Sequence, residues 1–345
     1  MHIRDLLQTE LPLIQAPMAG VQTSRLALAV GEAGGLGSLP AAMLALPALQ
    51  DELKALAAGG RAWNVNFFAH TTPPTDAARE AKWRARLAPY HAEHGIDIDK
   101  VPAGAGRQPF SHEAADVLEP FRPPIVSFHF GLPAPDLLQR VRGWGSRIIS
   151  SATTVDEALW LQEQGVDAVI AQGLEAGGHR GHFIDHDLTL QQGLMTLLPQ
   201  VVAAVRVPVI AAGGLSDARA VKAAMALGAS AVQVGTAYML CPEANTSALH
   251  RAALRSPQAR HTALTNLFTG RPARGIVNRV MRELGPLSPD APEFPMATAA
   301  IAPLRAAAEA KGLGDFTPLW SGQRVGNLDG LGAAALTRAL AEGLR

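Results

Sequence analysis

Short apolar segments alternate with Ala- and Leu-rich helical segments through the first two-thirds of the chain. Eight of the apolar segments are rich in β-branched residues and show no in–out alternation, a pattern typical of strands buried on both faces. The expected strands are 13–16, 36–39, 62–66, 125–128, 147–151, 168–172, 207–211 and 231–234. Most are followed by a helical segment, so the order predicts eight βα units closed into a TIM-type (β/α)8 barrel. An open sheet with a miscounted strand is the alternative, although no G-x-G-x-x-G motif opens any of the helices.

Two segments do not fit the βα repeat. Residues 68–122 are rich in proline, histidine and charge, which indicates helix and loop inserted after the third strand. Beyond about residue 242 the pattern becomes helical with irregular loops. We therefore expect a barrel over 1–241 that contains the insert at about 68–122. A mainly helical subdomain is expected over 242–345, with a C-terminal segment that covers the barrel mouth.

The composition excludes several classes of protein. The 345 residues include 30 Lys+Arg and 30 Asp+Glu, so the formal net charge is zero and neither nucleic acid nor an anionic membrane is expected as a partner. With 48% hydrophobic and 17% charged residues, the chain is too apolar to be disordered. The lone cysteine, Cys241, cannot form an internal disulfide, and neither a signal peptide nor an apolar run of ~18 residues is visible. These features favour a cytoplasmic protein with Cys241 as a buried structural thiol.

In a barrel of this type the chemistry lies at the carboxyl ends of the strands. The sixth expected strand is followed by the glycine-rich segment QGLEAGGHRG at 172–181, which carries His179. Glycines let the backbone approach a ligand closely, and a histidine there can act as an acid, a base or a hydrogen-bond donor near neutral pH. His179 is therefore the catalytic candidate. For Glu175 and Arg180, a role in orienting His179 and simple exposure to solvent are equally open.

The loops after the seventh and eighth strands predict an anion site. Gly213-Gly214 opens a helix and Gly235-Thr236 follows the last strand, and loops at these two positions form the usual phosphate site of the barrel. A phosphate-bearing cofactor is therefore expected, with a simple chain turn as the alternative. Asn66, after the third strand, would place an amide at the edge of a heteroaromatic ring or cap a turn. In the turn APMAG, Met18 would pack on a flat ring or in the core.

The remaining histidines are weaker candidates. His182 and His186 are four residues apart beside two aspartates, but the glycine-rich neighbourhood predicts a loop rather than a helix that presents both rings. No metal site is expected. A solvated position is expected for the four histidines of the charged insert, His70, His91, His94 and His112.

Several of these segments together make the sequence resemble the nitronate monooxygenase family, formerly called 2-nitropropane dioxygenases, and most closely its class I members from bacteria and fungi. The EAGGHRG run is the specific feature, whereas APMAG and AAGG also occur in other flavin barrels. The segments stand in the family's order: QAPMAG at 15–20, NVNFF at 64–68, AQGLEAGGHRG at 171–181, PVIAAGG at 208–214, QVGTAYM at 233–239 and TGRPARGIVN at 269–278.

The resemblance implies a TIM-type barrel with a second helical domain and noncovalently bound FMN. It implies that His179 is the catalytic histidine and that Gln323 reaches the pocket. The positions that would bind or line FMN are Ala16, Met18, Ala19, Gly20, Asn66, Gln172, Gly177, Gly178, Gly213, Gly214, Gln233, Val234, Gly235 and Thr236.

The implied reaction is the oxidative denitrification of a nitronate such as propionate 3-nitronate. The nitronate gives one electron to FMN, O2 then reacts, and the products are a carbonyl compound and nitrite. His179 would hold the anionic nitronate if protonated, or take the α-proton of a nitroalkane if neutral. An NAD(P)H:quinone or enoyl reductase on the same flavin barrel is the alternative. A flavin-free lyase or isomerase and a non-enzymatic binding protein are more distant, and the oligomeric state is left open.

Overall fold

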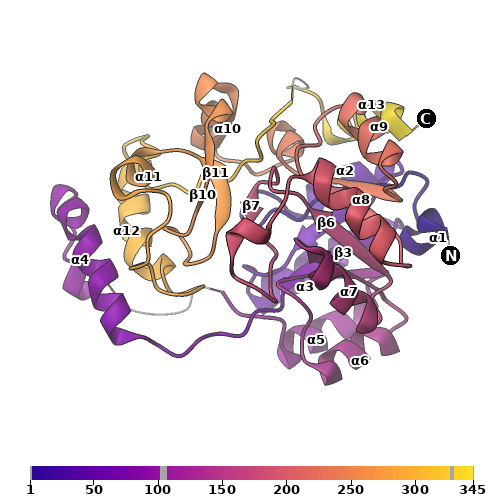
Figure 1. Ribbon diagram of the computed structural model, residues 1–345, viewed down its shortest axis with the longest axis horizontal. Helices are drawn as coiled ribbons and strands as arrows, with labels where there is room; N and C mark the ends of the chain where they lie inside the picture. The colour runs from indigo at the N-terminus through magenta and orange to yellow at the C-terminus, as the bar shows by residue number, and fades with distance from the viewer. Residues whose placement is uncertain (1, 102–106, 327–329, 345) are drawn as a thin grey trace.

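The computed structural model describes residues 2–101, 107–326 and 330–344, and its largest element is an eight-stranded parallel sheet (Figure 1). The neighbouring strands follow the order β1-β9-β8-β6-β5-β4-β3-β2. The Gln15 N–H donates to the Leu36 carbonyl (2.9 Å) and the Leu36 N–H to the Leu13 carbonyl (2.8 Å), so β1 and the segment before β2 join the two edges. This arrangement confirms the TIM-type barrel. Its strands are β1 Leu13–Gln15, β2 Gly37–Pro40, β3 Trp63–Phe68, β4 Ile125–His129, β5 Arg147–Ala152, β6 Ala168–Gln172, β8 Val209–Ala212 and β9 Ala231–Val234.

Both faces of these strands are apolar because both are covered. In β5, Ile148 packs with the outer helices while its neighbour Ile149 points into the barrel. The short helix α1 (Ile3–Leu7) places Leu6 and Leu7 against the same inner layer. The barrel interior is thus a packed core, and space for a ligand is left at its other end.

Eight helices form the outer layer, and the last of them comes from the end of the chain. The helix α13 lies against α2 and α9, beside the N-terminal part of the barrel (Figure 1). The sequence pattern did not reveal this return to the barrel. The helices are α2 Ser24–Glu32, α3 Leu46–Ala58, α5 His112–Leu118, α6 Pro135–Gly143, α7 Val155–Glu163, α8 Leu194–Ala204, α9 Ala218–Ala226 and α13 Ala333–Ala341.

A second body covers the carboxyl ends of the barrel strands. It contains an antiparallel sheet of order β10-β11-β7, in which the two-residue strand β7 (Gly178–His179) is contributed by the loop after β6. The strands β10 (Thr262–Thr265) and β11 (Ala273–Ile276) lie in the region expected to be mainly helical, so that expectation missed this sheet. The helices of this body are α4 Ala77–Glu93, α10 Ala248–Arg255, α11 Arg279–Leu284 and α12 Thr298–Glu309.

The insert after β3 contributes to both bodies. Trp83 and Leu87 of α4 pack with Phe316 and Leu304 in the core of the second body, and α4 is the element farthest from the barrel in Figure 1. The helix α5, by contrast, packs on α3 and α6 of the barrel. The domain boundaries at 68–122 and 241/242 stay predictions. Short 3-10 helices complete the description: η1 Ile98–Lys100, η2 Glu119–Phe121, η3 Leu188–Leu190, η4 Thr236–Leu240, η5 Pro257–Arg260 and η6 Glu342–Leu344.

In the described part of the chain, no helix combines the length and the apolar character that crossing a bilayer requires.

Candidate active site

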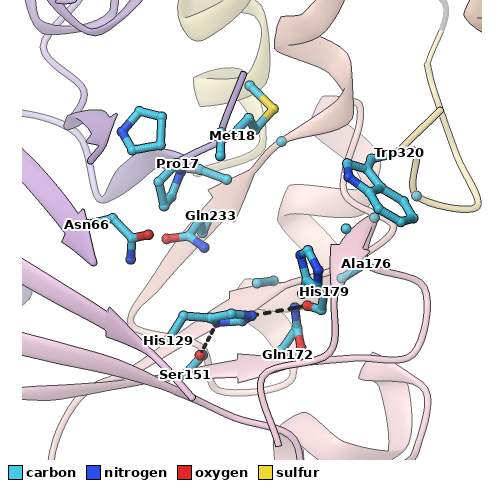
Figure 2. Close-up of a pocket in the computed structure, with 18 of the residues that line it drawn as sticks. Pro17, Met18, Asn66, His129, Ser151, Gln172, Ala176, His179, Gln233 and Trp320 are labelled. Atoms are coloured by element: carbon cyan, nitrogen blue, oxygen red, sulfur yellow. Dashed lines mark hydrogen bonds between the residues drawn. The ribbon is translucent and has the colours of Figure 1, made fainter. Parts of the chain in front are cut away.

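A pocket lies at the carboxyl ends of the barrel strands, and most of the predicted site residues line it (Figure 2). Gly20 and Val234 do not: Gly20 is exposed on the turn after β1, and Val234 is buried in the core. The Val234 carbonyl instead accepts a hydrogen bond from the Ala16 N–H (2.8 Å), which holds the first loop against β9. The predicted residues that line the pocket are Ala16, Met18, Ala19, Asn66, Gln172, Gly177, Gly178, His179, Gly213, Gly214, Gln233, Gly235 and Thr236.

The side chain of His179 projects from β7 into this pocket. Its Nε2 lies 3.0 Å from Oγ1 of Thr269, and its ring is 5.4 Å from the Phe294 ring and 5.5 Å from the Trp320 ring, centroid to centroid. The Thr269 hydroxyl can donate to the Arg271 carbonyl (3.3 Å), in which case it accepts the hydrogen of Nε2. In that tautomer Nδ1 is the basic nitrogen of His179.

The environment favours the uncharged form of His179. Burial lowers its pKa well below 6.5, and the guanidinium groups of Arg107 and Arg271 lower it further by charge repulsion. Near neutral pH the ring is therefore an imidazole. The sequence left open whether His179 works protonated or neutral, and the surrounding charges favour the neutral form.

The backbone of His179 is fixed by two side chains from the barrel. Its carbonyl accepts hydrogen bonds from Nε2 of Gln172 (2.9 Å) and from Nε2 of His129 (3.1 Å). Nδ1 of His129 in turn accepts from the Ser151 hydroxyl at 2.5 Å, and Figure 2 shows this chain of contacts. Burial lowers the pKa of His129 to about 3, so its Nε2 carries the hydrogen of a neutral ring. Sequence analysis missed His129 and Ser151, although both stand near the carboxyl end of a barrel strand.

The charged side chains of Arg180 and Glu175 bind backbone groups of the protein rather than facing the solvent. The Arg180 guanidinium is fully buried and donates to the carbonyls of Gly173 (2.6 Å) and Gln172 (2.8 Å). The Glu175 carboxylate accepts from the N–H of Leu194 (2.8 Å), at the start of α8. Both charges therefore hold the loop between β6 and β7 in shape.

One side of the pocket is a cradle of glycine backbone. Gly213 (φ +122°) and Gly214 (φ +68°) adopt conformations that side chains disfavour. A Cβ on Gly177 would collide with the backbone of Gly322 and lie 2.6 Å from the carbonyl carbon of Ser321. The Gly322 N–H donates to Oγ1 of Thr236 (2.9 Å), so the 321–324 segment closes over the loop after β9. Gln323 itself is exposed and does not line the pocket, so the expectation that it reaches the pocket was wrong.

Two amide side chains, those of Gln233 and Asn66, line another side of the pocket. Oε1 of Gln233 is buried and has no hydrogen-bond partner among the described residues. The Asn66 amide donates to Oγ of Ser127 (3.0 Å), and Figure 2 shows Asn66 and Gln233 directed toward each other below Pro17. A buried acceptor without a partner is costly unless a ligand supplies the donor.

The aromatic wall of the pocket was not predicted. Phe68 and Trp320 line the pocket, and Phe294 packs against the rings of both Phe68 and His179. Phe294 and Trp320 come from the region after residue 242, where no motif marked them. Sequence analysis also missed Arg107 of the insert, which lines the pocket.

Two histidines of the insert contradict the expected solvated position. His70 is buried beside Phe294, with ring centroids 4.7 Å apart. His91 is buried on the inner face of α4, where Nδ1 lies 2.9 Å from the Leu87 carbonyl. Charged residues of α4 such as Lys82 and Arg86 are exposed, so the helix has one buried and one solvated side. No group of three potential metal ligands occurs in the described part of the chain, and Cys241 is buried as expected.

Fold and pocket together define a (β/α)8-barrel protein whose ligand site is built around a neutral histidine and a glycine cradle. The model of the family described as nitronate monooxygenase matches residues 2–341. A nitronate monooxygenase of Pseudomonas aeruginosa is 42% identical over 348 aligned positions, which cover 99% of this chain and 98% of the relative. The chain therefore belongs to the nitronate monooxygenase family, and it is an oxidoreductase.

Solved structures agree with this assignment. A nitroalkane oxidase from Streptomyces ansochromogenes superimposes with a TM-score of 0.88 at 38% identity, over 99% of this chain and 97% of that one. FabK from Thermotoga maritima has a TM-score of 0.71 at 24% identity, over 99% of this chain and 94% of that chain, a likeness that shows the fold alone.

Proposed function

We propose that this protein is an FMN-dependent nitronate monooxygenase, which converts alkyl nitronates and O2 to carbonyl compounds and nitrite. The observation that carries the proposal is the position of neutral His179 in the same pocket as the glycine cradle and the unpartnered amide of Gln233. Membership of the nitronate monooxygenase family supports the substrate.

The residues of the pocket fit a flavin mononucleotide. Gly213, Gly214, Gly235 and Thr236 follow β8 and β9, where barrels of this type bind phosphate. Oε1 of Gln233 needs a donor, and the N–H of a flavin ring is one. We propose that these residues hold FMN, together with Ala16, Met18, Ala19, Asn66, Gln172, Gly177 and Gly178.

FMN, when bound, supplies the electron acceptor and the oxygen chemistry. The protein supplies position and proton transfer. Neutral His179 can take the α-proton of a nitroalkane through Nδ1, while Thr269 holds Nε2 in place. A nitronate has already lost this proton, so His179 only positions it. We propose that the rings of Phe68, Phe294 and Trp320, which all pack near the His179 ring, limit the access of water to the reacting carbon.

The proposal is tested by oxygen consumption of the purified protein with propionate 3-nitronate, with neutral nitroalkanes and with NADH. We expect a yellow protein that releases FMN on heating and consumes O2 with the nitronate while producing nitrite. Anaerobic mixing with NADH should leave the flavin oxidised. Rapid bleaching by NADH without a response to nitronate would favour the reductase alternative, and a colourless protein that takes up no FMN would refute the cofactor.

A further inference from the structure

His129 stands in the wall of the same pocket as His179, and the proposed chemistry gives it no role. It is the last residue of β4, and both of its ring nitrogens have partners. Nδ1 lies 2.5 Å from Oγ of Ser151 on β5, and Nε2 lies 3.1 Å from the main-chain carbonyl oxygen of His179. The side chain therefore connects two barrel strands to the short strand β7, which carries His179.

The partners of His129 fix the direction of both hydrogen bonds. A carbonyl oxygen can only accept, so Nε2 of His129 carries a hydrogen and donates it. Burial lowers the pKa of His129 to about 3, so the ring is neutral and has one hydrogen. Nδ1 must then accept, and the Ser151 hydroxyl is its donor. Ser151 thus selects the tautomer in which His129 can hold the carbonyl of His179.

The main chain at His179 needs this support because β7 is short. Its pairing with β11 involves residues 178 and 179 alone. The ring of His179 has a hydrogen-bond partner in the Thr269 hydroxyl, 3.0 Å from Nε2. The carbonyl is held from the barrel side by His129 and by Nε2 of Gln172 (2.9 Å), so the peptide plane that follows His179 is fixed by two donors. The direction in which the side chain leaves the main chain is fixed with it.

The residue after His129 packs against both histidines. Phe130 has a φ of +73°, a conformation that a bulky side chain seldom adopts. Its ring centroid lies 4.5 Å from that of His129 and 5.9 Å from that of His179, and the Arg271 guanidinium covers the ring at 4.1 Å. Such a conformation persists only where the surroundings hold it in place. This packing limits the sideways movement of both imidazoles.

We propose that His129 is a positioning residue for His179: with the help of Ser151 it holds the main chain of β7 so that Nδ1 of His179 meets the α-carbon of a nitroalkane. This inference rests on the proposed function. In the step concerned, the α-proton moves to Nδ1 of His179, and the electron pair of the C–H bond stays on the substrate to give the nitronate. The step is sensitive to position, since a displacement of about 1 Å can cost a factor of ~10² in rate. A preformed nitronate skips the step and depends on His129 much less.

The test exchanges the hydrogen-bonding ring for one without nitrogen. In His129→Phe we expect kcat for 1-nitropropane to fall about 10-fold or more, and kcat for its preformed nitronate to change less than about threefold. The kinetic isotope effect with 1-nitropropane deuterated at C1 should increase, because proton transfer becomes slower relative to the other steps. In His129→Gln the amide can donate in place of Nε2 and should restore most of kcat. Ser151→Ala keeps both rings and should act in the same direction by a smaller factor.

Two further measurements separate positioning from general damage to the fold. The Kd for FMN, from flavin titration of the apoprotein, should stay within about threefold in His129→Phe. His91→Phe is the matched control, because His91 is buried in α4, donates from Nδ1 to the Leu87 carbonyl (2.9 Å) and does not line the pocket. It should lower the melting temperature and leave both kcat values and the isotope effect unchanged.

Three results would overturn the inference. Equal losses for the nitroalkane and the nitronate, with an unchanged isotope effect, would mean that His129 only supports the pocket. Unchanged turnover of the nitroalkane in His129→Phe would show that the hydrogen bond to β7 does not position His179. Oxidation of the nitronate but not of the nitroalkane by the unaltered protein would leave no proton transfer for His129 to assist. If the unaltered protein oxidises neither compound, the proposed function fails instead.

Discussion

His179 shows what can and cannot be predicted at the scale of single residues. Its glycine-rich loop at the end of a strand marked it in the sequence, and the structure places it in the pocket. Its neutral state was not predictable, because it depends on burial and on Arg107 and Arg271, which are distant in sequence. His70 and His91 were misjudged for a related reason, since local charge says nothing about which face of a segment is buried.

Replacing His179 by Asn separates proton abstraction from positioning. The variant should retain FMN, because no cofactor contact is assigned to the imidazole. Turnover of a neutral nitroalkane should fall by about 10² or more, the usual contribution of a general base. Turnover of the preformed nitronate should fall less, since no proton has to be removed. Steady-state oxygen uptake with both forms of one substrate measures the difference, and an equal loss for both would contradict the assignment of His179 as the base.

The pH dependence follows from the lowered pKa of His179. In the proposed reaction the neutral ring of His179 is the base, and its lowered pKa means that the ring takes up a proton only at a pH well below 6.5. For a neutral nitroalkane, kcat/KM should therefore stay level from pH 7 down past 6.5 and fall only in more acidic solution. Arg107→Gln removes a repelling charge, so the acidic inflection should move to higher pH. An inflection at or above pH 6.5 in the unaltered protein would show that His179 is not the base or that its surroundings differ.

At the scale of elements, strands that alternate with helices were predictable and short pieces with long-range partners were not. All eight barrel strands were found to within a few residues, because buried runs of apolar residues are a local signal. The strand β7 has two residues, and its pairing with β11 joins positions more than ninety apart in the chain. The helix α13 completes the outer layer by packing on α2 and α9, and no local pattern indicates this.

Gly177 connects these elements to the proposed FMN site. A Cβ at this position would collide with the backbone at Ser321 and Gly322, and a backbone cannot give way as a side chain can. In Gly177→Ala we expect the two loops to separate and the Kd for FMN to rise about tenfold or more, because overpacking of this kind costs ~1–3 kcal/mol. Flavin titration of the apoprotein measures the affinity.

Gly143→Ala is the control, because a Cβ at the end of α6 meets nothing within 4 Å. It should leave the affinity for FMN unchanged. If Gly177→Ala binds FMN as tightly as this control, the close approach of the two loops does not shape the cofactor site.

At the scale of the whole molecule, the pocket depends on two bodies built from interleaved segments. The barrel supplies the cradle and the amides, while Phe294 and Trp320 come from the second body. Neutral histidines lie buried in both: burial lowers the pKa of His129 and His182 to about 3, and of His70 and His250 to about 4. Although the formal net charge is zero, the folded protein therefore takes up protons less readily in mildly acidic solution than the unfolded chain does.

The lowered pKa values of these histidines predict a loss of stability in mildly acidic solution. The unfolded histidines have a pKa near 6.5, so between pH 6.5 and about 4 the unfolded chain binds more protons than the folded one, and stability falls as the pH falls. Each such histidine contributes up to ~1.4 kcal/mol per pH unit in this range. The melting temperature should therefore decrease steadily from pH 7 to pH 5, before most carboxylates titrate.

His250→Gln isolates one of these contributions. His250 is buried and its Nε2 donates to the Trp320 carbonyl (3.0 Å), a hydrogen bond that the glutamine amide can replace. The variant should lose less stability between pH 7 and pH 5 than the unaltered protein, because one proton fewer is taken up on unfolding. His112→Gln removes an exposed histidine beside Asp136 and should not flatten the pH dependence in this way. Melting curves of the three proteins at matched ionic strength decide the point, and parallel pH dependences for all three would show that burial of neutral histidine does not govern acid stability.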